Sequence, residues 1–389
     1  MKVLFWISIA MVFYTFFGYG IVLFFLVKLR GVIKGKRKLP EVNNDELPAL
    51  SLIVAAYNEE HYIEEKIQNT LQLIYPAEKI QYIFVTDGST DNTPQIINKY
   101  EQITLMHKPE RSGKIAAVHR AMQQVTAEAV IFTDANTYLN KNALINICRH
   151  YSDEKVGCVS GEKRVHIESV SDATAGEGFY WKYESKLKQW DAELYSVVGA
   201  AGELFSVRTK LYEAVPPDTI LDDFMISLMI AEKGYRIIYE PNAYAMETSS
   251  ENVREELKRK VRIAAGGIQS IIKLSALLNV FKHPLLSFQY VSHRVLRWTI
   301  TPFLMILAFI VNAIIAFNTK EVLYVVLFAL QVLFYLIALL GWAFERKQLR
   351  IKILFIPFYF CMMNYAVIAG IIRYFSGSQS AVWEKAKRK

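Results

Sequence analysis

Long uncharged apolar stretches stand at both ends of the 389-residue chain, and shorter apolar runs alternate with amphipathic ones between them. The four uncharged stretches are residues 3–27, 299–318, 322–343 and 353–372. A helix of about 20 apolar residues crosses a bilayer, so each stretch is long enough to be a membrane span. The first is too long for the apolar part of a signal peptide and has no small-residue cleavage site after it, which predicts a retained anchor.

The middle of the chain has the alternation typical of an α/β fold. Strands are predicted over residues 50–56, 80–86, 103–108 and 129–134, and helices over 59–73, 93–101 and 114–125. Strands that alternate with helices in this way predict a mostly parallel sheet with helices on both faces. Such sheets bind their ligands in the loops beyond the carboxyl ends of the strands.

The region after residue 150 is less regular, although helices can still be predicted in it. An aromatic-rich helix is expected over 176–193 and a basic helix over 251–263, and residues 282–298 have the mixed composition of a helix at a membrane surface. The patterns divide the chain into a transmembrane anchor (1–28), a basic and polar linker (29–49), an α/β domain (50–265), interfacial helices (266–298), a C-terminal transmembrane region (299–375) and a basic tail (376–389).

Composition and charge agree with a multi-pass membrane protein. Hydrophobic residues make up 53% of the chain, and the mean hydropathy is +0.19. Basic residues follow the first apolar stretch directly, and such charge stays on the cytoplasmic side, so the α/β domain is expected in the cytoplasm. These residues are Lys28, Arg30, Lys34, Lys36, Arg37 and Lys38. The net charge of +8 is largely explained by such clusters, and we expect no nucleic-acid partner.

The C-terminal end gives a conflicting indication of topology. The basic tail favours the cytoplasm, whereas four full spans that start outside the cell would also end outside. One apolar stretch is therefore expected to be interfacial or re-entrant. The stretch 353–372, which contains Pro357 and Gly370, is the candidate.

Polar side chains follow two neighbouring predicted strands. Tyr57, Asn58 and Glu59 come after the first strand, and Asp87 comes after the second. A turn followed by a helix cap explains Asn58, Glu59 and Asp87 by themselves. Because both strands end at the same edge of the predicted sheet, these side chains also suit a nucleotide site, in which Asp87 would accept a hydrogen bond from a uracil N–H or a ribose hydroxyl.

The strand over 129–134 ends with Asp134 and Asn136, separated by one small residue. Asp and Asn are common in turns because they hydrogen-bond their own backbone. Their oxygen atoms are also ligands that Mg²⁺ and Mn²⁺ prefer, and Mg²⁺ often takes only one or two protein ligands beside water and phosphate. The pair predicts half of a metal site that a diphosphate would complete.

Three charged segments carry further candidate chemistry. Lys114 opens a helix after a basic turn, a place that suits a phosphate group as well as a solvated turn. Asp222 and Asp223 open another helix, where they stabilise the helix dipole or supply a general base. Arg259 and Arg262 lie in a basic helix that either neutralises a leaving diphosphate or faces the membrane surface.

Together these motifs resemble the family 2 glycosyltransferases with a GT-A fold. The motifs occupy residues 54–60, 85–93, 111–114, 132–137, 199–208 and 221–224. With membrane helices at both ends, the chain is similar to the polysaccharide-synthase branch, which includes cellulose, hyaluronan and poly-N-acetylglucosamine synthases. The resemblance implies an inverting transfer from a nucleotide sugar, usually a UDP-sugar, to a growing polysaccharide or glycan acceptor at the bacterial inner membrane.

The resemblance also implies a role for each matching residue. The residues implied to bind the nucleotide sugar are Tyr57, Glu59, Asp87, Lys114, Asp134, Arg259 and Arg262. Asp134 and Asn136 would take the place of the metal-binding Asp-x-Asp and hold Mg²⁺ or Mn²⁺. Asp222 and Asp223 would replace the family's Glu-Asp pair, and Asp223 would be the base that takes the acceptor proton.

The chain departs from the family pattern in ways that leave alternatives open. Asn136 replaces a metal-binding carboxylate, which predicts weaker metal affinity. The Gln-x-x-Arg-Trp signature of processive synthases is absent, and residues 259–263 keep only one arginine in register. One alternative is the transfer of a single sugar to a lipid acceptor, and another is an inactive, membrane-anchored scaffold or binding subunit. The need for an accessory subunit stays open.

Overall fold

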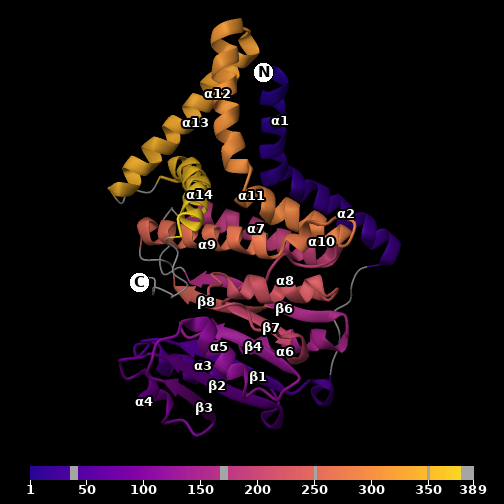
Figure 1. Ribbon diagram of the computed structural model, residues 1–389, viewed down its shortest axis with the longest axis vertical. Helices are drawn as coiled ribbons and strands as arrows, with labels where there is room; N and C mark the ends of the chain where they lie inside the picture. The colour runs from indigo at the N-terminus through magenta and orange to yellow at the C-terminus, as the bar shows by residue number, and fades with distance from the viewer. Residues whose placement is uncertain (36–42, 167–173, 249–251, 348–350, 378–389) are drawn as a thin grey trace.

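The computed structural model describes residues 1–35, 43–166, 174–248, 252–347 and 351–377. Figure 1 shows the α/β part of the chain at one end, a layer of helices across it, and long apolar helices that extend to the other end. The predicted basic residues at 36–38 and the tail from residue 378 lie outside the described residues.

An eight-stranded sheet forms the α/β part, with the strand order β3-β2-β1-β4-β7-β6-β8-β5. The strands are β1 Leu50–Ala56, β2 Ile80–Asp87, β3 Ile103–Lys108, β4 Ala129–Asp134, β5 Tyr138–Leu139, β6 Val156–His166, β7 Leu204–Arg208 and β8 Arg236–Thr248. β1 is parallel to β2 and β4, and β2 is parallel to β3. β7 is antiparallel to β4 and β6, whereas β8 is parallel to β6 and antiparallel to β5. The predicted mostly parallel α/β sheet is confirmed, with antiparallel pairs in its second half.

Helices cover both faces of the parallel half. They are α3 Ile63–Leu71, α4 Thr93–Ile97, α5 Lys114–Met122, α6 Ala143–Cys148 and α8 Asp222–Glu232. Successive side chains of a strand point to opposite faces, so Val54 and Phe84 pack with α3 and α4. Their neighbours Ile53 and Ile83 join the core that contains α5 and α8. The sheet is therefore buried on both sides, and its exposed polar groups gather at the strand ends.

The helix expected over 251–263 is longer than predicted and spans Val253–Lys273, and the helix expected over 114–125 ends at Met122. Two further predicted helices differ from the observed ones at their ends. The helix expected over 59–73 begins only at Ile63, since Asn58 has a left-handed backbone with a φ of 52° and residues 57–62 form a turn. The helix expected over 93–101 ends at Ile97, and a turn leads from there into β3. The first difference lies in the loop at the carboxyl end of β1, and the second lies in the turn before β3. Apolar periodicity does not predict where a helix begins or ends in such loops.

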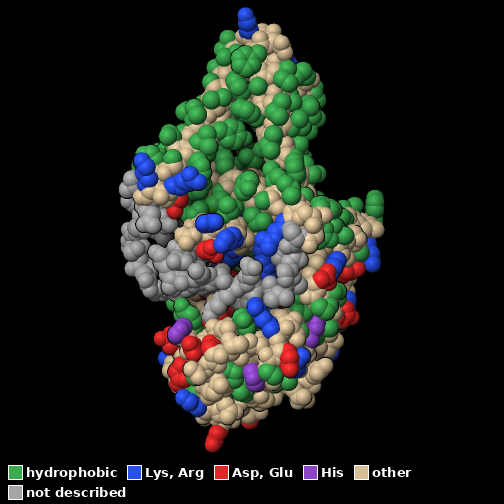
Figure 2. Space-filling view, turned by 60° about the vertical axis from the view of Figure 1, so that its left-hand side comes forward, with side chains coloured by type: hydrophobic (Ala, Val, Ile, Leu, Met, Phe, Trp, Pro, Cys, Tyr) green, Lys and Arg blue, Asp and Glu red, His purple; other side chains and the backbone are tan. Residues whose placement is uncertain are grey.

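Four helices are long and apolar enough to cross a membrane, among the residues that the structure describes. They cover Lys2–Lys34, Thr301–Thr319, Val322–Arg346 and Ile353–Phe375. The first comprises α1 Lys2–Phe13, a π-helical segment Tyr14–Gly18 and α2 Tyr19–Lys34, and the others are α12 Thr301–Thr319, α13 Val322–Arg346 and α14 Lys352–Phe375. Figure 2 shows apolar side chains covering this end of the molecule, as expected for a membrane protein.

The apolar helices pack against one another and against the helical layer. Phe5 of α1 is buried among Ala308 and Val311 of α12. Gly370 of α14 lies against α9, where an added Cβ would come within 2.5 Å of the Cβ of Ala264. The predicted interfacial or re-entrant stretch 353–372 thus lies in one continuous helix beside α9. Which of the four helices cross the bilayer, and in which direction, stays a prediction.

The helical layer between the sheet and the apolar helices is made of two long and several short segments. They are α7 Thr174–Leu194, α9 Val253–Lys273, α10 Pro284–Tyr290, a π-helical segment Val291–Val295 and α11 Leu296–Trp298. The last three form a continuous helical stretch that leads into α12 (Figure 1). Trp298 at its end packs on Phe224 of α8, with ring centroids 5.3 Å apart. The layer therefore touches the α/β part at the start of α8.

The segment before β7 also packs against the ring of Phe224. Gly199 has a φ of 83°, and a Cβ at this position would lie 2.1 Å from the ring of Phe224. Only glycine tolerates both that backbone conformation and that approach. Gly199 and Trp298 therefore both contact Phe224 at the start of α8.

We predict that Gly199→Ala destabilises the protein more than Gly234→Ala does. Both glycines have a positive φ, 83° and 91°, so both alanines carry the same kind of backbone strain of about 1–2 kcal/mol. Only the alanine at 199 also meets Phe224, because nothing lies within 4 Å of a Cβ at 234. Such overpacking adds about 1–3 kcal/mol. Thermal unfolding of the full-length protein in detergent measures the difference, and equal shifts of Tm would contradict the packing argument.

Candidate functional site

The parallel strands bring the polar motifs to one edge of the sheet. β1 is in register with its neighbours up to its end, so that Ala56 lies beside Thr86 and Ala55 beside Asp134. The residues that follow Ala56, and the side chains of Asp87 and Asp134, therefore stand close together. This is the edge at which ligands bind in open α/β sheets.

The loops after β1 and β2 are joined by hydrogen bonds. The Asn58 side-chain oxygen accepts from the Thr90 backbone N–H at 2.8 Å, and the Glu59 N–H donates to the Thr93 hydroxyl at 2.9 Å. The interpretation of Asn58 as a helix cap is wrong, since α3 starts later and Asn58 binds the neighbouring loop. The Arg111 guanidinium lies 3.9 Å from the centre of the Tyr57 ring, which links this pair of loops to the basic turn.

Asp87 fixes that basic turn to the sheet. Its Oδ2 accepts hydrogen bonds from the backbone N–H groups of Ser112 and Gly113, at 2.7 and 2.6 Å. Its Oδ1 lies 3.5 Å from Arg120, which also donates to the Thr86 carbonyl at 2.8 Å. The side chain is only 4% exposed. Sequence reasoning missed Arg120, because an arginine in the last turn of a helix looks like an ordinary partner of the helix dipole.

Lys114 and Asp134 form an ion pair at the centre of the edge. The Lys114 Nζ lies 2.7 Å from the Asp134 Oδ1. Burial lowers the pKa of Lys114, but the carboxylates of Asp134, Asp222 and Asp223 outweigh it and raise that pKa above its ordinary value. Lys114 is therefore a fixed positive charge surrounded by acids from two separate segments, and sequence reasoning had placed these acids only in separate motifs.

Asn136 offers an oxygen atom that suits a cation. Its Oδ1 is buried, and no hydrogen-bond partner for it exists among the described residues. A buried polar atom without a partner is costly, so such an atom calls for an ion or water. The described residues contain no group of three or more His, Cys, Asp or Glu side chains arranged for a metal. A carboxylate and an amide oxygen fit a cation that takes its other ligands from water and phosphate.

Lys66 is a site residue that sequence reasoning missed. Its side chain is 0% exposed, and its Nζ donates to the Thr137 carbonyl at 2.7 Å and to the Thr133 hydroxyl at 3.2 Å. These two residues flank Asp134 and Asn136, so the hydrogen bonds of Lys66 fix both ends of the loop that carries the predicted metal ligands. Burial lowers the pKa of Lys66 to about 7. The available signal was a lysine on the buried face of a helix, where an apolar residue is expected.

Asp223 is held near Lys114 at the start of α8. Burial and the neighbouring Asp222 raise the pKa of Asp223 to about 7, although Lys114 opposes the shift. A Cβ added at Gly202 would lie 3.0 Å from the Asp223 Oδ2, so the backbone before β7 touches this carboxylate. A small cavity lined by Lys114, Gly202 and Asp222, among others, joins the two segments. The helix-dipole role alone does not explain an acid with a raised pKa.

The predicted cations of α9 lie in a separate group of charges. Arg259 makes two hydrogen bonds of 3.0 Å to Glu256 of the same helix, and the carboxylates of Glu256, Glu247 and Glu203 raise its pKa although burial opposes the shift. Arg262 lies one turn further along and is half-buried. Next to this group, Lys163 forms ion pairs with Glu203 and Glu247. Sequence reasoning missed these three residues, although Glu203 belongs to the motif at 199–208.

Comparison with known proteins agrees with this geometry. Residues 51–215 match the family model described as Glycosyl transferase family 2. The similarity to this family model covers the sheet from β1 to β7. The match ends before Asp222 and Asp223, so the functions of these two residues depend on the geometry alone.

Curated proteins similar to this chain include a polysaccharide synthase. The poly-beta-1,6-N-acetyl-D-glucosamine synthase of Staphylococcus aureus is 29% identical over 247 residues, which cover 61% of this chain and 58% of the relative. The probable glycosyltransferase YdaM of Bacillus subtilis is 24% identical over 266 residues, or 62% of this chain and 61% of YdaM. The chain thus aligns with about three fifths of the length of these curated relatives.

A solved structure confirms the fold along most of the chain. The mannosyltransferase PcManGT of Pyrobaculum calidifontis, in complex with GDP-Man and Mn²⁺, superimposes with a TM-score of 0.74. It is 24% identical and covers 97% of this chain and 100% of its own. The predicted GT-A fold with additional helices is confirmed by this comparison.

We predict that Asp87→Ala opens the basic turn to trypsin at Arg111. The substitution removes the acceptor of two backbone N–H groups, so residues 108–114 lose their attachment to the sheet. Limited proteolysis of the full-length protein, followed by mass spectrometry, should show faster cleavage there. Asp91→Ala is the matched control, because Asp91 binds Glu60 and Thr93 and not this turn. Unchanged cleavage in Asp87→Ala would contradict the proposed attachment.

Proposed function

We propose that this glycosyltransferase moves a sugar from a nucleoside-diphosphate sugar to a hydroxyl of a glycan acceptor at the cytoplasmic face of a cell membrane, with inversion at the anomeric carbon. The observation that supports it most is the half-buried carboxylate of Asp223, with its raised pKa, beside Lys114 and the strand-end motifs. A general base works best when its pKa is near the operating pH.

The donor would bind along the edge of the sheet. Tyr57, Glu59 and Asp87 would surround the nucleoside, and the joined loops after β1 and β2 would give them fixed positions. Lys114 would bind the diphosphate, since its positive charge is stabilised by several acids and stays in place. A phosphate group at the start of α5 would also interact with the backbone N–H groups there.

Asp134 and Asn136 would hold Mg²⁺ or Mn²⁺ with the diphosphate. Such a metal, when bound, neutralises negative charge on the departing nucleotide. Lys66 fixes the backbone of this loop, and the Asn136 oxygen has room for a ligand. Arg259 and Arg262 are the protein cations that we assign to the leaving diphosphate after the bond to the sugar breaks.

The chemical step would be a single displacement. Asp223 would accept the proton of the acceptor hydroxyl while its oxygen attacks the anomeric carbon, and the nucleoside diphosphate would leave from the opposite side. Asp222 raises the pKa of Asp223 and so strengthens it as a base. The protein residues thus orient the donor, hold the acceptor proton and stabilise the charge of the leaving group.

The proposed acceptor is a growing polysaccharide. The named activity of the Staphylococcus aureus relative favours a growing polysaccharide and UDP-N-acetylglucosamine as the donor. A lipid acceptor that receives one sugar and an inactive scaffold are the alternatives. The half-buried Asp223, whose pKa is raised by burial and by the neighbouring Asp222, favours an active enzyme over a scaffold. An accessory subunit would add to either active form.

A donor panel tests the proposed function. Purified full-length protein in nanodiscs would receive UDP-N-acetylglucosamine, UDP-glucose or GDP-mannose with Mg²⁺, Mn²⁺ or EDTA, and nucleotide release and product length would be measured. Release with one donor that EDTA stops would support the metal-dependent transferase. Products of many sugars would support a polymer, and products of one sugar on lipid would support the alternative acceptor. Nucleotide binding without release under any condition would favour the scaffold.

We predict that Asp223→Asn lowers kcat by at least about 100-fold and leaves nucleotide affinity within about twofold of wild type. The amide keeps the size of the side chain but cannot accept the proton, and general-base catalysis contributes about 10²–10⁴ to a rate. Turnover and isothermal titration with the nucleoside diphosphate measure the two quantities. Asp218→Asn is the control, since Asp218 is exposed and binds Lys273. Normal turnover of Asp223→Asn would exclude this residue as the base.

We predict that the acid limb of the kcat profile lies near pH 7. Asp223 must be deprotonated to act, its pKa is raised to about 7, and activity should therefore rise with pH up to that value and then level off. Asp222→Asn removes a neighbouring negative charge and should move the limb to lower pH. A limb near pH 4 in the wild type, or no movement in Asp222→Asn, would contradict the assignment.

A further inference from the structure

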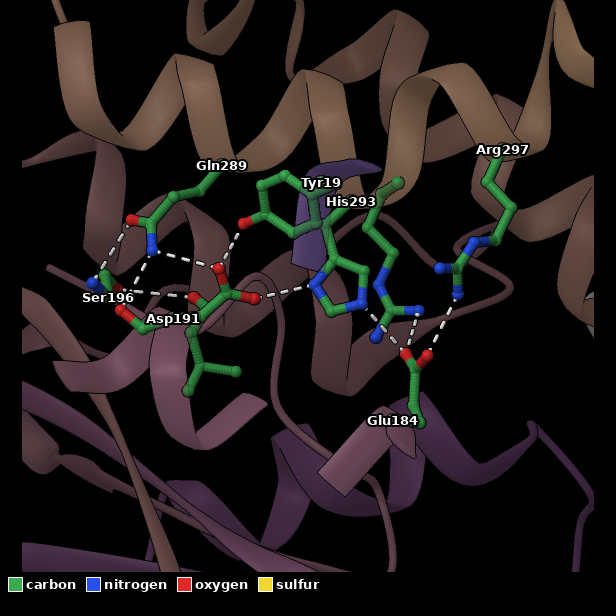
Figure 3. A network of polar contacts seen from close by, with 9 residues as sticks. Tyr19, Glu184, Asp191, Ser196, Gln289, His293 and Arg297 are labelled. Carbon is green, nitrogen blue, oxygen red and sulfur yellow. Dashed lines mark hydrogen bonds and ion pairs between the residues drawn. The ribbon is translucent and has the colours of Figure 1, made fainter. Parts of the chain in front are cut away.

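A buried network of charges joins the first apolar helix, α7 and the helical stretch that leads into α12 (Figure 3). Its centre is His293, which is 1% exposed and stands between two carboxylates of α7. The members are Tyr19, Glu184, Asp191, Gln289, His293, Arg294 and Arg297. None of these residues belongs to the proposed donor site, so the network needs an explanation of its own.

His293 bridges two carboxylates of α7. Its Nδ1 lies 2.6 Å from the Asp191 Oδ2, and its Nε2 lies 3.0 Å from the Glu184 Oε1. Burial opposes ionisation of Glu184, but Arg294, Arg297 and His293 outweigh it and hold the pKa of Glu184 well below its ordinary value. The imidazole ring therefore ties both carboxylates to the stretch that carries His293.

One connection leads from Glu184 to the start of α8. Arg294 binds Glu184 at 2.8 Å, and its guanidinium lies 5.6 Å from the centre of the Trp298 ring. Trp298 packs on Phe224, the residue directly after Asp223. Displacement of Arg294 would therefore move or loosen the aromatic contact beside the proposed base.

A second connection leads from Asp191 to the other side of the same residue. Gln289 donates to the Asp191 Oδ1 at 3.0 Å and accepts from the backbone N–H of Ser196 at 3.4 Å. Ser196 begins the segment that continues to Gly199 and Gly202, and these glycines touch Phe224 and Asp223. The two carboxylates of α7 are thus linked, through Trp298 and through the segment 196–202, to Phe224 and Asp223 at the start of α8.

The same network includes the first apolar helix. The Tyr19 hydroxyl donates to Asp191, and the Tyr183 hydroxyl of α7 donates to the Phe16 carbonyl at 2.9 Å. Tyr14 and Ser292 add a hydrogen bond of 2.8 Å between this helix and the stretch that carries His293. The first apolar helix, α7 and the helical stretch that carries His293 are therefore joined by one set of polar contacts.

We infer that His293 is a positioning residue: with Glu184 and Asp191 it sets the position of Asp223 relative to the membrane helices. The inference rests on the proposed role of Asp223 as the base. His293 itself does not touch the donor edge, and it acts through Arg294, Trp298 and Gln289. Its loss should therefore affect the chemical step more than donor binding.

His293→Gln in the full-length protein in nanodiscs tests the inference. Glutamine can bind one carboxylate but cannot bridge both, so kcat should fall about 10- to 100-fold, as expected for a misplacement of about 1 Å, with the donor KM and nucleotide affinity within about twofold. Hydrogen–deuterium exchange should rise at least about threefold in peptides that cover residues 222–228 and 199–204. His283→Gln is the matched control, because the His283 Nε2 has no hydrogen-bond partner among the described residues, and the same substitution there should leave both readouts at wild-type values.

Trp298→Ala separates positioning from a general loss of stability. It leaves the charges of the network in place and removes the contact with Phe224, so it should reproduce the loss of kcat without unfolding the helical layer. Wild-type exchange over residues 222–228 in His293→Gln, or a wild-type kcat in Trp298→Ala, would overturn the inference. If the wild type turned over no donor, the proposed function would fail, and the exchange measurements alone would decide the positioning role.

Discussion

The parallel pairing of β1 with β2 and β4 is the constraint on which the donor edge depends. Parallel strands share a carboxyl end, so three loops separated by dozens of residues in the sequence meet there without any long-range recognition of their own. Packing on both faces supports the register, since a slip of one residue would exchange the side chains that fit the two different sets of helices. The loops are then free to carry polar residues, because the strands supply the stability.

Electrostatic balance explains the arrangement of charges at that edge. Lys114 stands among Asp134, Asp222 and Asp223, and each group alone would be costly to bury. Together they keep the lysine charged while one acid, Asp223, is pushed toward its neutral form. Lys66 is the opposite case: burial lowers its pKa to about 7, because the attraction of Asp134 is too weak to offset the loss of solvent, and its ammonium group binds only a carbonyl and a hydroxyl.

Local patterns predicted the first four strands well, because each is a short apolar run that can be recognised without knowing its partner in the sheet. The runs 50–56, 103–108 and 129–134 have the bounds of β1, β3 and β4. The same patterns missed Lys66, since periodicity assigns a buried helix position to an apolar residue. They also missed the bridge between Glu184 and His293, which are separated by 109 positions and meet only through the packing of α7 against the helical layer.

The packing of Trp298 changes the meaning of the missing synthase signature. Residues 259–263 lack a tryptophan, yet the ring of Trp298 lies over α9 at Gly267, where an added Cβ would come within 2.4 Å of it, and it also contacts Phe224. An aromatic side chain from another segment thus occupies the space between α9 and the start of α8. Arg294 of the buried charge network contacts the Trp298 ring, so this aromatic side chain has a fixed position although it lies outside the signature. The absence of the signature in α9 therefore does not by itself indicate single transfer.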